Sequence, residues 1–435
     1  MFLITVAQVG FCIKINMSVS SFISNRLSLR DGRNRKFSPA IIVAIAGVAM
    51  AFFVMMLSIA VVGGFKSEIT RKIMGFDAQI SVMPLQAFYG SDNTGMTYEE
   101  GIKQAVEDAG ARCGINNSLS VALSVSETGM LKTADNFQGL EFRAVGEGGD
   151  DAFMKSVLKE GRLVTDSVPN GIVISRKTAD RLGLSLDDKV DAYFIKDGVV
   201  RPRRFQVTGI YSSGFGDYDE AIVFAPYVTI AKLHGFDAGR GDRLEISGLD
   251  VGAIAPFAHE LQSALMDAYG DGRISEAMAV NSVLTTGAAY FNWLALLDTN
   301  VVVILILMGC VSGFMLITCV IILILQRVRM VGILKSVGAC DSQIRGIFMR
   351  LGARVIFSGL AIGNVLGLLV IWIQARWHLL PLDPESYYLT SVPVEFNIWS
   401  WLALNAGIIV LSYALMLLPA GMISRLSPVK ILRFE

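Results

Sequence analysis

The sequence predicts a membrane protein of four transmembrane α-helices, with a large α+β domain inserted between the first and second helices. Three observations support this fold class. The 435 residues are 53% hydrophobic and 17% charged, with a mean hydropathy of +0.54, which is too apolar for a soluble globular protein. Four long segments carry no charge, and a short basic stretch between two of them orients the chain across the membrane.

The chain is expected to begin with a cytoplasmic lead-in over 1–36, in which 1–16 precede Met17, an alternative translation start. Arg and Lys are frequent near its end, as is typical of the cytoplasmic side. Span one follows over 37–63. It contains 24 consecutive uncharged residues, which at about 1.5 Å per residue exceed a hydrocarbon core of roughly 30 Å. A polar helix that leaves the membrane is expected to start at Gly63-Gly64.

The exported domain is predicted over 64–298, because no segment there is long and apolar enough to span. From 65 to 297 the chain has 22 Lys and Arg residues against 31 Asp and Glu, an acid excess compatible with the far side of the membrane. Strands and helices mix without regular βαβ spacing, which favours an α+β fold. The expected strands are 78–82, 171–174, 189–194, 204–210 and 221–224, and the expected helices are 98–109, 175–182 and 256–269.

The sequence offers little catalytic chemistry. Its three His residues lie far apart, which argues against a His-based metal site or triad. In the acidic turn GFGDYDEA, Asp217, Asp219 and Glu220 could bind a cation, but a solvated turn is the preferred interpretation. Cys113 is the one cysteine of the exported domain, so no disulfide is expected within it. No phosphate-binding loop motif occurs, so we expect that this chain is not itself an ATPase of that type.

Spans two to four are predicted over 299–325, 355–375 and 398–420. Small residues on spans two and three should allow close helix approach: Gly309, Ser312 and Gly313 on span two, and Gly359, Gly363 and Gly367 on span three. A short outer loop over 376–397 joins spans three and four. The tail over 421–435 is basic, so both termini are expected in the cytoplasm.

The basic stretch over 326–354 is the loop between spans two and three. It carries six Arg and Lys residues against one acid, Asp341, which predicts a cytoplasmic location. Apolar residues recur at helical spacing around a break at Gly338-Ala339, as in a short amphipathic helix along the membrane's inner face. Such a helix could anchor the loop in the interface. Alternatively, it could be a coupling helix that docks into a cytoplasmic motor.

Several motifs carry a family resemblance. The run from Gly332 to Ala339, GILKSVGA, resembles the signature between the second and third spans of FtsX/MacB-type permeases of ABC transporters. Residues 174–211 resemble the MacB-type periplasmic core domain. The outer loop LDPESYYLTSVPVEFN and the ending at Leu432–Glu435 resemble lipoprotein-releasing permeases most closely. One departure is Met330, which stands where family members often have a carboxylate.

The resemblance implies a bacterial inner-membrane protein that works with a separate ATPase subunit. ATP and Mg would be bound by that partner, with no cofactor held by this chain. The docking residues would be Gly332, Ile333, Leu334, Lys335, Val337, Gly338 and Ala339. Other implied partners are a second permease, the same or related, acylated lipoproteins, membrane lipid and a periplasmic carrier, but no nucleic acid. A lipid or cargo cavity would be lined by Ala51, Val54, Leu57, Ser58 and Val61.

Other functions stay open. The connection over 195–203 is short and lacks the long hook to which a periplasmic carrier docks in one lipoprotein-releasing subunit. The chain could use a shorter contact, resemble the partner subunit, or use no carrier. A MacB-like efflux permease for drugs or peptides is one rival function. The other is an FtsX-like scaffold that activates a cell-wall hydrolase and transports nothing.

Overall fold

The chain divides into two compact units. The helical unit holds 39–65, 295–380 and 392–421, and the inserted domain holds 66–294 together with 381–391. The lead-in over 1–36 and the tail beyond Gly421 lie outside the described residues. The computed structural model describes residues 39–89, 95–115, 119–164, 168, 170–196, 198–237, 239–383 and 387–421.

Within the described residues, four helices are long and apolar enough to cross a membrane: α2 (Pro39–Phe76), α11 (Ala288–Gln326), α13 (Asp341–Trp377) and α15 (Ile398–Gly421). The first three have 38, 39 and 37 residues, so each is longer than a hydrocarbon core of roughly 30 Å requires. The polar helix expected to start at Gly63-Gly64 is not a new element. Instead, the polar residues after the two glycines are part of α2, which continues without a break to Phe76.

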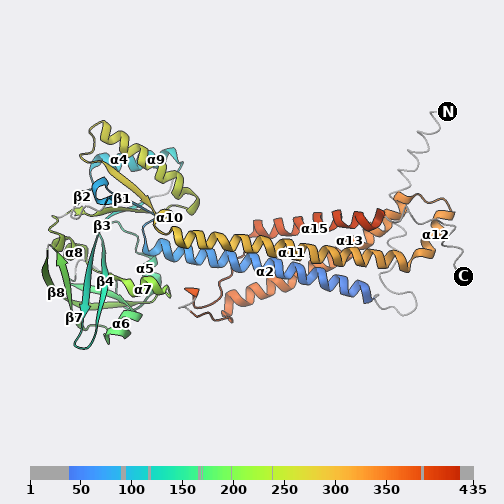
Figure 1. Ribbon diagram of the computed structural model, residues 1–435, viewed down its shortest axis with the longest axis horizontal. Helices are drawn as coiled ribbons and strands as arrows, with labels where there is room; N and C mark the ends of the chain where they lie inside the picture. The colour runs from blue at the N-terminus through green and yellow to red at the C-terminus, as the bar shows by residue number, and fades with distance from the viewer. Residues whose placement is uncertain are drawn as a thin grey trace. The chain divides into compact units, whose positions relative to one another are not determined.

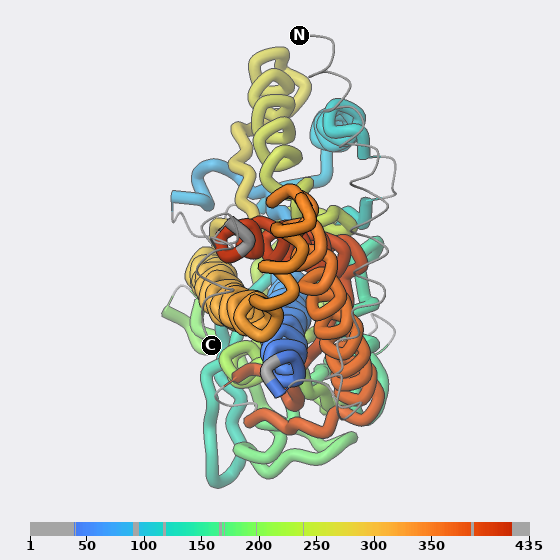
Figure 2. The backbone as a smooth tube through the Cα atoms, turned by 90° about the vertical axis from the view of Figure 1, so that its right-hand side faces the viewer, coloured from blue at the N-terminus to red at the C-terminus, as the bar shows by residue number. Residues whose placement is uncertain are grey.

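The small residues of the spans mark where helices touch, as the sequence predicted. A Cβ atom at Gly359 would lie 2.8 Å from Val48, and one at Gly363 would lie 2.8 Å from the carbonyl oxygen of Ala49. The glycine strip of α13 therefore packs on α2 at backbone distance. Gly309 and Gly313 of α11 face the side chains of Leu411 and Leu415 of α15. Figure 2 looks along the helices and shows α2, in blue, between α11 and α13.

The inserted domain mixes short helices with many strands. Its helices are α3 (Leu85–Phe88), α4 (Glu100–Arg112), α5 (Ala152–Val157), α6 (Arg176–Leu182), α7 (Gly216–Ala221), α8 (Tyr227–His234), α9 (Val251–Gly270) and α10 (Val283–Thr286). Its strands are β1 (Ile80–Pro84), β2 (Met96–Thr97), β3 (Ser120–Lys132), β4 (Phe137–Val145), β5 (Leu158–Gly161), β6 (Gly171–Ser175), β7 (Lys189–Lys196), β8 (Val199–Tyr211), β9 (Ile222–Phe224), β10 (Arg240–Gly241), β11 (Arg243–Ser247) and β12 (Met278–Ser282).

Ten of these strands form one mixed sheet in the order β12-β1-β11-β3-β4-β9-β6-β8-β5, with β7 paired to both β3 and β8. The β4–β9 and β6–β8 pairs are parallel, and the other pairs among the described strands are antiparallel. Strands β2 and β10 form a separate ribbon. The mixture of parallel and antiparallel pairs agrees with the α+β class that the irregular element order predicted.

The domain has two lobes that share the long strand β3 (Figure 1). One lobe is built from the two ends of the domain sequence, where α4 and α9 pack together beside β1, β11 and β12. The other is built from the middle and holds a large apolar cluster that includes Phe142, Phe194 and Phe205. All five expected strands and all three expected helices have counterparts, but the β3–β4 hairpin and the strands β5, β11 and β12 of the same sheet were not predicted.

Candidate functional site

The segment between α11 and α13 contains the short helix α12 (Val328–Ser336), which is followed by a tight turn. Gly338 adopts a positive φ of 91°. Its N–H donates to the Lys335 carbonyl (3.1 Å), and the Ala339 N–H donates to the Leu334 carbonyl (2.9 Å). This is a Schellman motif, which favours glycine at the left-handed position. Nothing lies within 4 Å of the Cβ position of Gly338, so backbone conformation rather than crowding favours glycine here.

The next helix begins immediately after the turn. Cys340 caps α13, and its N–H donates to Gln343 Oε1 at 3.0 Å. An ion pair of 2.9 Å joins Lys335 Nζ to Asp341 Oδ1 across the turn. We call α12, the turn and the first two turns of α13 the elbow (residues 328–348). The short amphipathic helix that the sequence predicted is present as α12, but it ends at Ser336, and Ile344 and Phe348 after the break already belong to the helix that becomes span three.

The elbow separates the seven predicted docking residues into two groups. Gly332 is buried, and Leu334 and Ala339 pack against an apolar cluster that contains Ile344 and Phe348. The Lys335 side chain is only 11% exposed, and it forms an ion pair with Asp341. In contrast, Ile333 is 57% exposed and Val337 82% exposed, and Gly338 is exposed as well. Together with exposed Arg329 and Ser336, the first two follow the i, i+4, i+7, i+8 spacing of one helix face. We call Arg329, Ile333, Ser336 and Val337 the elbow face.

Met330, where a carboxylate was expected from the family pattern, is half-buried. The elbow does contain a carboxylate that forms an ion pair, Asp341, but this residue follows the motif instead of preceding it. The missing acid therefore leaves the turn itself intact.

The five predicted cavity residues do not share one environment. Ala51 is buried in a cluster of the helical unit that also contains Phe52 and Met55, and Leu57 packs against this cluster. Val54, Ser58 and Val61 are half-buried. Together with exposed Met50, the residues Val54, Leu57 and Val61 form a stripe at i, i+4, i+7, i+11. Ala51 lies off that stripe and fills the interior of a single chain.

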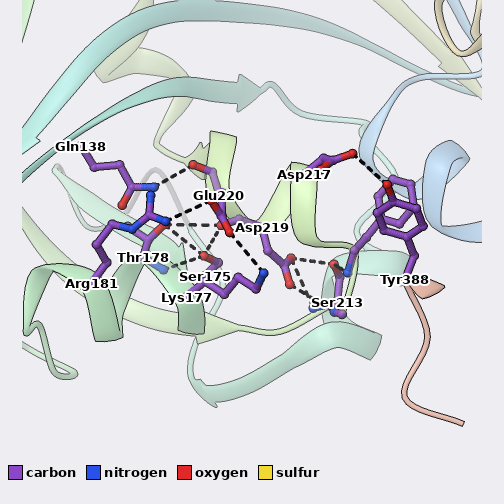
Figure 3. Close-up of polar contacts among 12 residues, drawn as sticks. Gln138, Ser175, Lys177, Thr178, Arg181, Ser213, Asp217, Asp219, Glu220 and Tyr388 are labelled. Atoms are coloured by element: carbon purple, nitrogen blue, oxygen red, sulfur yellow. Dashed lines mark hydrogen bonds and ion pairs between the residues drawn. The ribbon is translucent and has the colours of Figure 1, made fainter. Parts of the chain in front are cut away.

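The acidic turn is not the solvated turn that the sequence predicted, because it is helical and Asp219 is buried. It folds into α7, where each carboxylate has different partners (Figure 3). Asp217 Oδ2 accepts hydrogen bonds from the hydroxyls of Tyr290 (2.9 Å) and Tyr388 (3.4 Å). Glu220 pairs with Lys177 (3.2 Å) and Arg181 (3.1 Å) of α6. Among the described residues, no group of three His, Cys, Asp or Glu could hold a metal ion.

Asp219 is the innermost of the three acids and is only 2% exposed. Its carboxylate accepts from Ser213 Oγ (2.6 Å) and from the Gly214 N–H (3.1 Å). Burial raises the pKa of Asp219 above its ordinary value, and the hydrogen bonds from Ser213 and Gly214 oppose that rise. The Ser175 hydroxyl donates to the Asp219 carbonyl and ties α7 to the end of β6. These contacts fix α7 firmly in the middle lobe.

A cleft of about 560 Å³ within the inserted domain was not foreseen from the sequence. Buried Arg143 lies on its lining and pairs with Asp77 (3.1 Å) and Glu141 (3.7 Å). The hydroxyl of Tyr218 donates to the second oxygen of Asp77. The pKa of Tyr218 lies well above its ordinary value, first because of burial and then because of the Asp77 charge.

Comparison with known families identifies the class of protein. Residues 41–256 match the MacB-like periplasmic core domain, and residues 301–428 match the FtsX-like permease C-terminal domain. The first match covers span one and most of the inserted domain, and the second covers the later spans, in the expected order. The chain therefore belongs to the FtsX/MacB-type permeases of ABC transporters, a family that implies a partner ATPase subunit.

Individual relatives add detail. The chain is 21% identical over 427 residues to the lipoprotein-releasing system transmembrane protein LolC of Xylella fastidiosa, with 94% of this chain and 97% of that protein covered. It is 23% identical to LolC of Neisseria meningitidis serogroup B, with 96% and 100% covered. Among solved structures, the extracellular domain of the ABC-type transporter YknZ from Gram-positive bacteria aligns with 47% of this chain and 99% of its own, at 17% identity and a TM-score of 0.31.

Proposed function

We propose that this chain is a permease subunit that extracts acylated lipoproteins from the bacterial inner membrane for transfer toward the outer membrane. The observation that carries the proposal is the extent of the similarity to proteins named for lipoprotein release, which covers 94–96% of this chain. The excess of Arg and Lys over 326–354 orients the elbow and both termini to the cytoplasm.

A separate ATPase subunit, which holds ATP and Mg, docks on the elbow face. Three features support this role. Ile333 and Val337 present an apolar ridge to solution, Arg329 adds positive charge beside it, and the Schellman turn with the Lys335–Asp341 pair stiffens the segment. Because α13 begins within the elbow, a push on α12 reaches span three without an intervening flexible loop.

A second permease, the same chain or a related one, faces the stripe of Met50, Val54, Leu57 and Val61. Residues at this stripe, with Ser58 beside it, contact the acyl chains of the cargo. Each buried acyl CH₂ group stabilises the membrane-bound state by about 0.8 kcal/mol. A lipoprotein with three acyl chains therefore leaves the membrane too slowly by thermal motion, which explains the need for ATP.

The hairpin of β7 and β8 bears on transfer to a periplasmic carrier. The two strands pair as far as Lys196 and Val199, so only two residues connect them and the chain has no room for a hook there. Ile195, Val199 and Val200 expose apolar side chains at this tip. Any carrier contact there is limited to these few residues, which suits a brief encounter better than a stable complex.

The test is reconstitution of the purified permease–ATPase complex in proteoliposomes that contain a triacylated lipoprotein. Release of the lipoprotein on addition of ATP and Mg, and no release with a non-hydrolysable analogue, supports the proposal. Hydrolysis without release, together with capture of an outer-membrane channel, contradicts it in favour of efflux. In cells depleted of this protein, daughter cells that fail to separate while lipoproteins are still sorted correctly would also contradict the proposal. That result would favour a cell-wall scaffold.

A further inference from the structure

The outer loop between α13 and α15 belongs to the inserted domain, although the sequence places it after the third span. Residues 381–391 form part of the same compact unit as 66–294. Pro381 and Ser391 form a β-bridge, and the Leu382 N–H donates to the Thr390 carbonyl at 3.0 Å. Leu389 is buried. The loop is thus an anchored element and not merely a connection between two spans.

A buried lysine ties this loop to the end of α2. Lys72 is 6% exposed, and its Nζ donates to the carbonyl oxygens of Tyr388 (2.8 Å) and Ser213. Tyr388 itself has a positive φ of 59°, an uncommon conformation for a bulky residue. Strain of this kind persists only where surrounding contacts hold it, and the lysine supplies one of those contacts.

A second set of contacts joins the start of α11 to the same point. Tyr290 and Tyr388 both donate to Asp217 Oδ2. The ring of Phe215 packs on Tyr388 (4.8 Å between centroids) and on Tyr290 (5.4 Å). Burial, followed by the charge of Asp217, raises the pKa of Tyr388. Asp217 is therefore a common acceptor for two segments far apart in the sequence.

We propose that Lys72, Ser213, Asp217, Tyr290 and Tyr388 form a clasp that carries motion of the membrane helices into the inserted domain. The clasp gathers three segments that continue into spans: the end of α2, the start of α11 and the loop between α13 and α15. All three meet at α7 and the turn before it, which the Asp219 and Glu220 contacts fix to the middle lobe. Asp217 and Lys72 are its positioning residues.

This arrangement gives each of the three acids of one short helix its own partners. Asp219 and Glu220 hold α7 in the domain, whereas Asp217 reaches outward to Tyr388 (Figure 3) and also accepts from Tyr290. A displacement of α2 relative to α11 then changes the distances between the hydrogen-bonding groups of the clasp. A single attachment could absorb such a displacement by bending, but three attachments at one rigid helix transmit it.

The proposal rests on ATP-driven motion but not on the cargo, so its test uses nucleotide alone. Hydrogen exchange of the full permease–ATPase complex is compared with and without ATP and vanadate. In the wild type, nucleotide trapping should alter exchange in the strands of the middle lobe. In the double variant Tyr290→Phe with Tyr388→Phe, which loses only two hydroxyls, that change should fall several-fold while ATP hydrolysis continues.

The matched control is Tyr387→Phe. Tyr387 neighbours Tyr388 and is 50% exposed, so this variant should behave as the wild type does. An independent variant, Asp217→Asn, should reproduce the loss because the amide is a weaker acceptor for two hydroxyls. An undiminished exchange response of the middle lobe in both clasp variants would overturn the proposal. Because no lipoprotein is present, failure here is separate from failure of lipoprotein release in the reconstitution.

Discussion

The elbow and the α2–α13 interface both depend on glycine, but for different physical reasons. Gly363 is enclosed: an added Cβ would lie 2.8 Å from the Ala49 carbonyl. Gly338 faces open space, and its positive φ alone favours glycine. The first region is therefore closed by contacts within one chain, whereas the second holds a stiff turn that leaves an apolar ridge uncovered. That difference separates a glycine required by helix packing from a glycine required by backbone conformation.

The largest effect is expected from filling the closed interface. Gly363→Leu should destabilise the helical unit by about 3 kcal/mol, because the new side chain must displace backbone and the ring of Phe52. Thermal unfolding of the purified protein in detergent measures the change. Gly407→Leu on α15 is the matched control, since nothing lies within 4 Å of its Cβ position. Equal destabilisation by both substitutions would contradict the packing role of Gly363.

A smaller effect is expected at the elbow turn. Gly338→Ala should cost about 1–2 kcal/mol, because an L residue is forced into the left-handed region. Gly338→Asn should cost less, since asparagine tolerates that conformation. Unfolding measurements and the affinity of the ATPase subunit should follow the order Gly, Asn, Ala. If alanine proved better tolerated than asparagine, crowding and not φ would decide the residue at this turn.

The smallest effect is expected from the ion pair of the elbow. Lys335→Met keeps the apolar stem and removes the charge, so it should cost at most about 1 kcal/mol, the range of partly exposed ion pairs. A double-mutant cycle with Asp341→Asn should give a positive coupling energy. Fully additive losses would show that the 2.9 Å contact between Lys335 and Asp341 contributes no stability.

Much of the architecture follows from local features of the sequence. Uncharged length predicts the spans, and small residues four apart predict the helix contacts at Gly359 and Gly363, because both depend on neighbours along one helix. The positive φ of Gly338 similarly fits the break that the apolar spacing indicated. These features need no knowledge of distant contacts.

The clasp could not be predicted in the same way. Asp217 and Tyr388 are 171 residues apart, and no spacing rule links an acid in a turn to a tyrosine in a later loop. The acidic turn therefore suggested solvation, although tertiary packing gives each carboxylate its own partners. Likewise, the inward position of Ala51 depends on contacts with other helices. Within the GILKSVGA motif, the spacing alone likewise does not separate the exposed Ile333 and Val337 from the buried Gly332.

The most direct test of the docking surface is co-purification of the ATPase subunit with the variant Ile333→Glu plus Val337→Glu. The control is Ile195→Glu, another exposed isoleucine, at the tip of the β7–β8 hairpin. We predict that the elbow variant loses the ATPase while its thermal unfolding matches the wild type, and that the control retains the ATPase. Full retention of the ATPase by the elbow variant would contradict the assignment of the elbow face as its docking site.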